Sequence, residues 1–197
     1  RAPPPGSVIV ESGDAFQLLG REAMVRIGSE ELPLDRLDRP RLKLVYDHWQ
    51  RLRGSRDMPS RRDIDPFALK EALGIVMIAR YEPEHDDFRF SLFGTEVATS
   101  QRIDYTNKLA SELEPRPFAE LVVKSYRLVR TTRRPFYGRL SLSHDRAQLV
   151  SYHRLVLPLG DDGQHVDALL VASDHEKAFW QTLYDELRER GGKCPPE

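Results

Sequence analysis

Residues 75–95 read IVMIARYEPEHDDFRFSLFGT, and their pattern decides the fold. The opening run, residues 75–81, is rich in β-branched and aromatic side chains, which favour extended strands. The run FRFSLF at residues 88–93 alternates, so that every second side chain lies on the same face of a strand. A polar, proline-containing segment separates the two runs. The stretch therefore predicts a β-hairpin that ends at its final Gly-Thr pair.

Three further strands are predicted downstream of this hairpin, at residues 136–143, 148–159 and 165–173. The turn sequence GDDG at residues 160–163 joins the last two. Two strands followed, after a helical stretch, by three hairpin-joined strands indicate an antiparallel sheet. We therefore expect an α+β fold with a five-stranded antiparallel sheet.

Helical patterns surround and interrupt these strands. An amphipathic helix is predicted over residues 35–53, and two helical turns over residues 66–73. Short helical pieces occupy residues 95–114, and a long amphipathic helix begins after Pro115. A last helix is predicted over residues 176–190. The insert between the second and third strands must pack on one face of the sheet, and a small-molecule cavity between sheet and insert is a natural expectation.

The chain divides by composition into an irregular N-terminal extension, an amphipathic helix with its connector, the sheet-containing domain, and a C-terminal helix with its tail: residues 1–34, 35–57, 58–174 and 175–197. Within the extension, residues 7–10 and 23–27 have the composition of short strands, and a small hairpin is one interpretation of them.

Composition limits the classes of protein to consider. Apolar residues make up 40% of the 197 residues, enough for one core, and charged residues make up 31%. The apolar run GIVMIA at residues 74–79 is far shorter than the roughly 20 residues that span a bilayer, so we expect no membrane partner. The net charge of −1 gives no general attraction to nucleic acid. No charged region followed by an apolar region opens this sequence, so we expect no secretory signal. The single cysteine, Cys194, permits no disulfide framework and favours a cytoplasmic location.

Three motifs carry a resemblance to a known family. Residues 58–66, MPSRRDIDP, resemble the opening signature of a PAS-like family common in alphaproteobacteria, in which Leu/Met-Pro, an Arg and Asp-Ile-Asp-Pro precede a short helix. Residues 88–95 resemble its second strand, which ends in Gly-Thr. Residues 154–159, with the Asp-Gly pair 162–163, resemble its fourth strand and the following turn. The chain thus resembles a PAS domain, with flanking N- and C-terminal helices.

The insert departs from the family pattern Gly-Arg/Lys-Asp-Leu-Thr-Gly. Residues 101–107 read QRIDYTN, in which Asp104 and Thr106 match. Asn107 replaces a glycine, and Asn is the next best residue at positive φ, so we expect the turn to be kept. The bulky Tyr105 changes the pocket that the family pattern would otherwise form.

The resemblance implies a stand-alone sensory or regulatory module without catalytic residues, which signals through a protein partner or its own homodimer. In PAS-like proteins, flanking helices often cover the open sheet face or pair two subunits. Large aromatic side chains concentrate on the two predicted flanking helices, where they are candidate interface anchors: Tyr46, Trp49, Trp180 and Tyr184. The alternative is that they pack within their own subunit.

Several residues are candidates to line a cavity for a small ligand, and four of them are aromatic: Phe93, Tyr105, Tyr126 and Tyr137. The alternative is an ordinary filled core. Arg102 offers a charged anchor for a carboxylate, against a plain surface role. His153 alternates with leucines along its strand, as a cavity-facing haem ligand would, although a hydrogen-bonded, half-buried histidine is the preferred interpretation. The sequence requires no cofactor, and we expect neither haem nor flavin.

Two other classes of function compete with a sensor. One is a small-molecule isomerase or dehydratase on a cone-like α+β fold, which needs an acid–base group in a deep apolar pocket, and His153 and Arg154 are the chief sheet-facing candidates. The other is a structural adaptor with a filled core.

The arginine-rich segments 51–62 and 130–134 suggest either an anionic ligand or, preferably, a locally paired surface. No Gly-x-Ser-x-Gly elbow and no phosphate-binding glycine loop occurs.

Overall fold

The computed structural model describes residues 9–10, 25–144, 147–174, 180–181 and 184–185. Two expectations fall outside these residues. Cys194 is one, and most of the helix predicted over residues 176–190 is the other. Of that helix, Trp180–Gln181 and Tyr184–Asp185 are described, and both pairs are helical.

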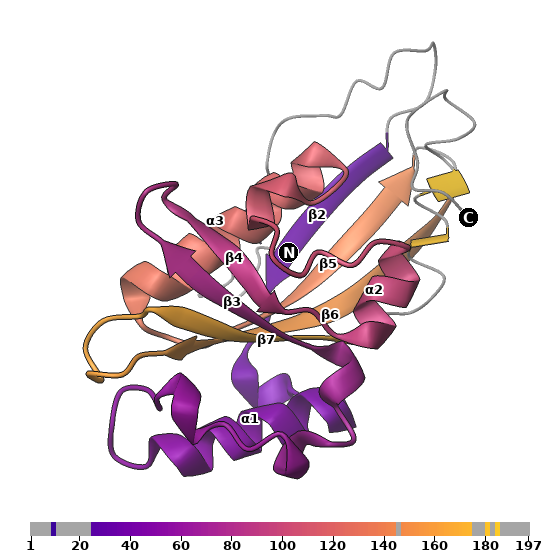
Figure 1. Cartoon of the computed structure of the whole chain (residues 1–197). Coiled ribbons are helices and arrows are strands. Elements are labelled where there is room, and N and C mark those ends of the chain that lie inside the picture. Colours follow the sequence, from indigo (N-terminus) through magenta and orange to yellow (C-terminus); the bar gives the residue numbers. More distant parts are fainter. Residues whose placement is uncertain (1–8, 11–24, 145–146, 175–179, 182–183, 186–197) are drawn as a thin grey trace.

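The strands form one antiparallel sheet in the order β1-β2-β5-β6-β7-β3-β4 (Figure 1). The five predicted strands are β3 to β7, and β2 extends them at the β5 edge. The expectation of five strands is therefore wrong: among the described residues, six strands have six or more residues, and β1 adds two. Their bounds are β1 Ile9–Val10, β2 Val25–Glu31, β3 Val76–Glu82, β4 Asp87–Leu92, β5 Phe136–His144, β6 Ala147–Leu159 and β7 Ala168–Asp174.

Within the described residues up to Asp174, three α-helices and five 3-10 turns accompany the sheet. The two helical turns predicted over residues 66–73 are 3-10 turns (η3 and η4), and the first helix begins at Pro40 rather than at residue 35. Proline is favoured at the first helical position because its missing N–H needs no partner there. The bounds are α1 Pro40–Arg53, α2 Thr95–Gln101, α3 Arg116–Thr132, η1 Leu34–Arg36, η2 Arg61–Asp63, η3 Phe67–Leu69, η4 Leu73–Ile75 and η5 Ala110–Glu112.

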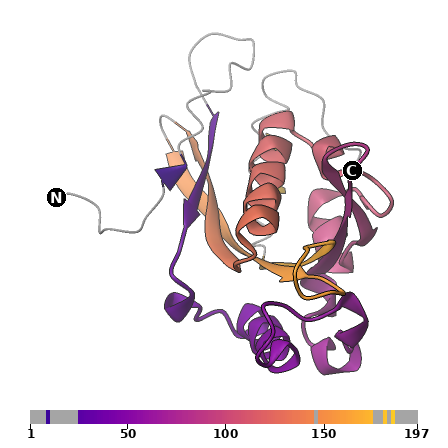
Figure 2. The ribbon, with the colours of Figure 1, turned by 90° about the vertical axis from the view of Figure 1, so that its left-hand side faces the viewer.

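The sheet is covered on both faces. Figure 2 shows α3 on one side of it and α1 on the other. We call the side of α3 the inner face and the side of α1 the outer face. Alternation along β6 divides its side chains between them. Tyr152 and Arg154 point inward, where Arg154 lies over Phe118 of α3, and His153 and Leu155 point outward. Both sets are screened from solvent, although His153 is only half-buried.

The outer layer is anchored by Trp49 of α1. This side chain is fully buried, and its indole Nε1–H donates a hydrogen bond of 2.8 Å to the main-chain carbonyl of Pro158 in β6. Leu42 and Val45 of the same helix are also fully buried. A buried indole that finds an acceptor avoids the cost of an unpaired polar group. Helix α1 is thus part of the folded unit.

The inner layer rests on α3, whose apolar side chains recur at helical spacing. Phe118, Val122, Tyr126 and Val129 are all buried to 1% exposure or less. The ring of Tyr126 meets that of Phe88 edge-on, with centroids 5.4 Å apart. The long helix predicted between the second and third central strands is therefore confirmed, and its apolar face covers the sheet.

The insert turn is formed as expected. Asn107 has a positive φ of 67°, the conformation for which the family pattern uses glycine. Asp104 Oδ1 accepts hydrogen bonds from the main-chain N–H of Thr106 at 2.8 Å and from its hydroxyl at 2.6 Å. The main-chain N–H of Asn107 then donates to the carbonyl of Phe90 at 2.8 Å, which ties the insert to β4.

Gly94 connects β4 to the insert, and close packing explains the glycine. Its φ of −60° is open to any residue. A Cβ at this position, however, would lie less than 3.0 Å from main-chain atoms of Gly74 and Val76. The hydrogen atom of glycine is what lets the two segments approach.

Replacing Gly94 with valine should therefore destabilise the protein by about 2 kcal/mol or more, because the added atoms meet backbone that has nowhere to move. Urea unfolding followed by circular dichroism measures the change. The exposed neighbour Thr95 supplies the matched control, Thr95→Val, which should stay within about 0.5 kcal/mol of wild type. Equal urea midpoints for the two variants would show that the close packing of Gly94 against Gly74 and Val76 contributes nothing to stability.

Candidate functional site

Three of the predicted cavity residues lie together on the inner side. Phe93 meets Phe90 edge-on with centroids 5.0 Å apart, and it lies 5.6 Å from the ring of Tyr105. Tyr126 of α3 lies 6.4 Å from Phe90. The sequence therefore identified side chains that gather between sheet and insert. In the described part of the chain they pack ring against ring, as in a filled core.

Burial sets the ionisation of the two inner tyrosines. Tyr126 is 1% exposed, and burial raises its pKa to about 12, against a smaller opposing effect of Arg154. Burial also raises the pKa of Tyr105, while the hydrogen bond that its hydroxyl accepts from the main-chain N–H of Glu114 lowers it in part. Both tyrosines therefore stay neutral at physiological pH and offer hydroxyl groups, not charges.

Arg102 lies at the C-terminal end of α2, away from the ring cluster. It adopts a left-handed conformation with φ of 58°, and its guanidinium donates to Oε1 of Gln181 at 3.2 Å. The guanidinium carbon also lies 5.5 Å from the ring centroid of Tyr184. The contacts of Arg102 are thus with the C-terminal segment, and its role as a carboxylate anchor stays a prediction.

Tyr137 and His153 are on the opposite side of the sheet from the other candidates. The expectation that they face the inner cavity is wrong, because alternation places both on the outer face, near the start of α1. The Tyr137 hydroxyl and His153 Nδ1 form a hydrogen bond of 2.6 Å. The preferred interpretation of His153, a hydrogen-bonded and half-buried histidine, is what the structure shows.

The electrostatic surroundings of this pair come from the outer layer. Burial lowers the pKa of His153 below its ordinary value of 6.5, and the positive charges of Arg39 and Arg139 lower it further. Burial raises the pKa of Tyr137, and Asp38 adds to the effect. The pair is therefore neutral at pH 7, which fits a structural contact between β5, β6 and α1.

The predicted interface anchors are mostly buried in their own chain. Trp49, Trp180 and Tyr184 are 0%, 1% and 2% exposed. Trp180 meets Phe118 edge-on at 5.0 Å, and the Tyr184 hydroxyl donates to the main-chain carbonyl of Gln101. For these three, the alternative of packing within the subunit is the observed one. Tyr46 is half-buried beside Trp49, so its surface is partly open to a partner.

Arg154, named from the sequence as a sheet-facing polar residue, lies on the inner face. It is 4% exposed, and its guanidinium carbon lies 5.3 Å from the ring centroid of Phe118. One terminal nitrogen donates to the Tyr152 hydroxyl, and Nε has no hydrogen-bond partner. No ion pair of Arg154 is found among the described residues. The feature of the sequence that points to this buried arginine is its position at the start of the otherwise apolar run RLVLPL, residues 154–159.

A second unpaired group lies beside Arg154. Ser173 of β7 is its register partner, is fully buried, and has a hydroxyl without a hydrogen-bond partner. Burying a cation costs several kcal/mol, whereas a cation–π contact returns up to about 2 kcal/mol and a charged hydrogen bond about 1.5–3 kcal/mol. The Nε–H of Arg154 and the Ser173 hydroxyl are thus the two groups here that an added polar partner would satisfy.

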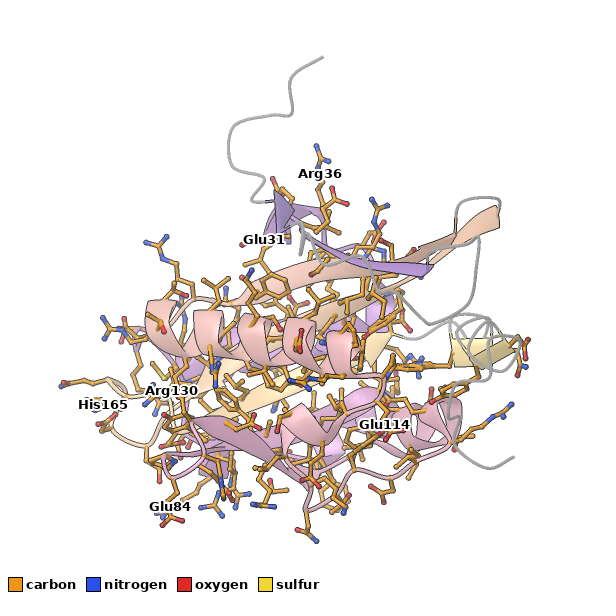
Figure 3. The ribbon with its side chains drawn as sticks, turned by 90° about the horizontal axis from the view of Figure 1, so that it is seen from above. Glu31, Arg36, Glu84, Glu114, Arg130 and His165 are labelled. Carbon is orange, nitrogen blue, oxygen red and sulfur yellow. The ribbon has the colours of Figure 1, made fainter. Side chains whose placement is uncertain are left out.

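A surface cleft of about 270 Å³ lies at one end of the sheet, lined by Arg61, Arg62, Arg80, Tyr81, Asp161, Asp167 and Ala168. Figure 3 shows Glu84, Arg130 and His165 at this same end of the domain. Arg130 stacks on Tyr81 at 3.6 Å, and Arg62 lies 3.7 Å from Asp161. The lining is of mixed charge, as in the locally paired surface preferred for the arginine-rich segments.

The two sheet-facing candidates for acid–base chemistry, His153 and Arg154, do not lie together. His153 points to the outer face and Arg154 to the inner face, so the sheet separates them.

Within the described ranges, no group of three or more His, Cys, Asp or Glu side chains is arranged to hold a metal ion. Among the same residues, no helix has the length and apolar character needed to span a lipid bilayer.

Comparison with known proteins adds one finding. A family model described as a PAS domain matches residues 37–172, more than half of the chain. The match begins within the outer layer and ends within β7. No curated protein and no solved structure matches the chain.

The buried His48 and the half-buried His153 predict a loss of stability in acid. Burial lowers the pKa of each histidine below its ordinary value of 6.5 in the folded state. At a pH between the folded pKa and 6.5, the unfolded chain therefore binds more protons than the folded chain, and protonation favours unfolding. The free energy of unfolding should therefore fall as the pH is lowered from 7 to 5.

Urea unfolding at several pH values measures this dependence. The double variant His48→Gln/His153→Gln should show a flatter dependence, whereas the control His85→Gln, at an exposed site, should keep most of it. A double variant as sensitive to acid as the wild type would contradict the assignment.

Proposed function

The chain belongs to the PAS domain family, and we propose that it is a non-catalytic sensory or regulatory module that acts through protein contacts. Membership in this family suggests a sensory or regulatory role, and PAS domains are generally not catalytic. The proposal goes further in two respects. It assigns the signalling contact to the α1 side of the molecule, and it places a small ligand between the sheet and the insert.

The observation that carries the proposal is a bridge made by Arg41 of α1. One terminal nitrogen lies 2.7 Å from a carboxylate oxygen of Glu96 in the insert helix α2. The other lies 3.1 Å from a carboxylate oxygen of Asp174 at the end of β7. A single side chain therefore connects the outer helix, the insert and the end of β7.

These contacts are of a kind that a regulatory element uses. Partly exposed ion pairs contribute up to about 1 kcal/mol each, so a modest displacement of α2 is enough to break one. The apolar contacts of Trp49 keep α1 on the sheet meanwhile. Ligand-dependent movement of the insert would thus change the position or mobility of α1 without unfolding the domain.

The outer side also presents an apolar surface to a partner. Phe67, in η3, is 86% exposed, and η3 packs against α1. Tyr46 of α1 is half-buried. Exposed aromatic side chains of this kind are typical anchors of protein interfaces. The partner in this proposal is a second copy of the chain or a separate signalling protein.

We extend the proposal to the organisation of the chain. Residues 58–174 form the sensory domain, residues 35–57 the helix that transmits the change, and residues 175–197 a flanking segment. Residues 1–34 are an extension, although β2 at its end joins the sheet. A structural adaptor with a filled core is the remaining alternative, and ligand binding distinguishes the two.

Replacing Arg41 with methionine should loosen α1 selectively, because both ion pairs are lost while the buried contacts of Trp49 remain. Hydrogen exchange should become at least about threefold faster in α1, with a change in unfolding free energy under about 1.5 kcal/mol. Lys43→Met is the matched control, since Lys43 pairs only with Asp47 in the same helix among the described residues. Equal exchange in the two variants would contradict the coupling.

The contact surface is tested by placing a photo-crosslinking phenylalanine analogue at Phe67 and irradiating living cells. A discrete crosslinked product is expected, because an exposed interface anchor lies within reach of its partner. Twice the mass of the chain identifies a homodimer, and any other defined mass identifies a separate partner. The control position is Lys124, which is exposed on α3. No product at Phe67, or the same products at both positions, would refute a contact through this surface.

A further inference from the structure

The inner face contains a buried positive charge that the described contacts do not satisfy. We propose that Arg154 binds the carboxylate of a small monocarboxylic acid held between β6, β7 and α3. The inference deepens the proposed sensory function, on which it rests, by naming the class of ligand. It stands on the burial of Arg154, on its unpaired Nε–H, and on the unpaired hydroxyl of Ser173 beside it.

An acceptor is the group that this position lacks. A guanidinium carries only hydrogen-bond donors, so each buried N–H of Arg154 needs an acceptor. The Tyr152 hydroxyl accepts one of its hydrogen bonds, but that hydroxyl is neutral, because burial raises the pKa of Tyr152 well above its ordinary value. The described residues bring no carboxylate into ion-pair distance of Arg154. The Nε–H of Arg154 is therefore open to an acceptor from outside the described residues.

The surroundings select the kind of anion. One unpaired guanidinium matches one negative charge, and the planar fork of arginine is suited to a carboxylate. The side chains around it are apolar or aromatic, since Phe118 lies under the guanidinium and Val156 follows on the same face of β6. A monocarboxylic acid with a compact apolar body satisfies both requirements. Ser173, the register partner of Arg154, offers its unpaired hydroxyl as a second donor for such a ligand.

The position links the ligand to the rest of the proposed mechanism. Phe118, on which Arg154 lies, also meets Trp180 of the C-terminal segment edge-on at 5.0 Å. Asp174, next to Ser173 on β7, pairs with Arg41 of α1. An acid bound at Arg154 therefore lies one residue along β7 from the bridge to the outer helix.

The test uses the full chain, labelled with nitrogen-15, and titrates it with benzoate, phenylacetate and hexanoate. Each acid is compared with its neutral amide, which keeps the shape and removes the charge. At least one acid should shift the Nε–H resonance of Arg154 in a saturable manner and raise the melting temperature. Its amide should bind at least about tenfold more weakly. The resonance is assigned by its disappearance in Arg154→Lys.

Two variants complete the test. Arg154→Met should abolish the response to the acids, whereas Arg139→Met should keep it, because Arg139 lies on the outer face and pairs with Glu30. Should Arg154→Met fail to fold, the comparison of acid with amide on the wild-type chain decides. No saturable response to any acid, equal binding of acid and amide, or unchanged binding by a folded Arg154→Met would overturn the proposal. The crosslinking at Phe67 and the exchange of α1 would still report on the sensory function separately.

Discussion

The structure depends on a sheet whose central strand is buried on both sides. Strand β6 pairs with β5 up to Val156 and with β7 from His153 to Leu159, so its middle residues have a strand on each side. Its side chains are divided between two layers. Removing either layer would expose half of this strand to water. The domain therefore has to keep α1 and α3 together, and the position of one is energetically connected to that of the other.

The same constraint explains what sequence could and could not predict. The hairpin at residues 75–95, the three later strands and α3 were all readable, because local alternation or helical period records which face is apolar. Alternation cannot say which of two apolar faces meets which helix. His153 was therefore expected on the inner side, where Arg154 is found. Strand β2 was only partly foreseen, since its sequence VRIGSEE carries little apolar signal.

The aromatic residues show a related limit. A tryptophan on a flanking helix has the same sequence pattern whether it packs on its own sheet or on a partner. Trp49 is distinguished only by its tertiary contacts: an acceptor in β6 lies within hydrogen-bond reach of its indole. Tyr46, one turn earlier, keeps part of its surface open. Burial of the larger ring within the subunit leaves the neighbouring positions, with the exposed Phe67, to meet other molecules.

The burial of Trp49 and Trp180 on opposite sides of the sheet has a practical consequence. These are the two tryptophans of the chain, one packed on the outer face against β6 and the other on Phe118 of α3. Indole emission depends on the polarity around the ring, so each of them acts as an optical reporter of its own layer. In a variant that keeps only one of the two tryptophans, the wavelength of maximum emission would report when the layer around that tryptophan opens. Comparing the two variants would show which layer opens first.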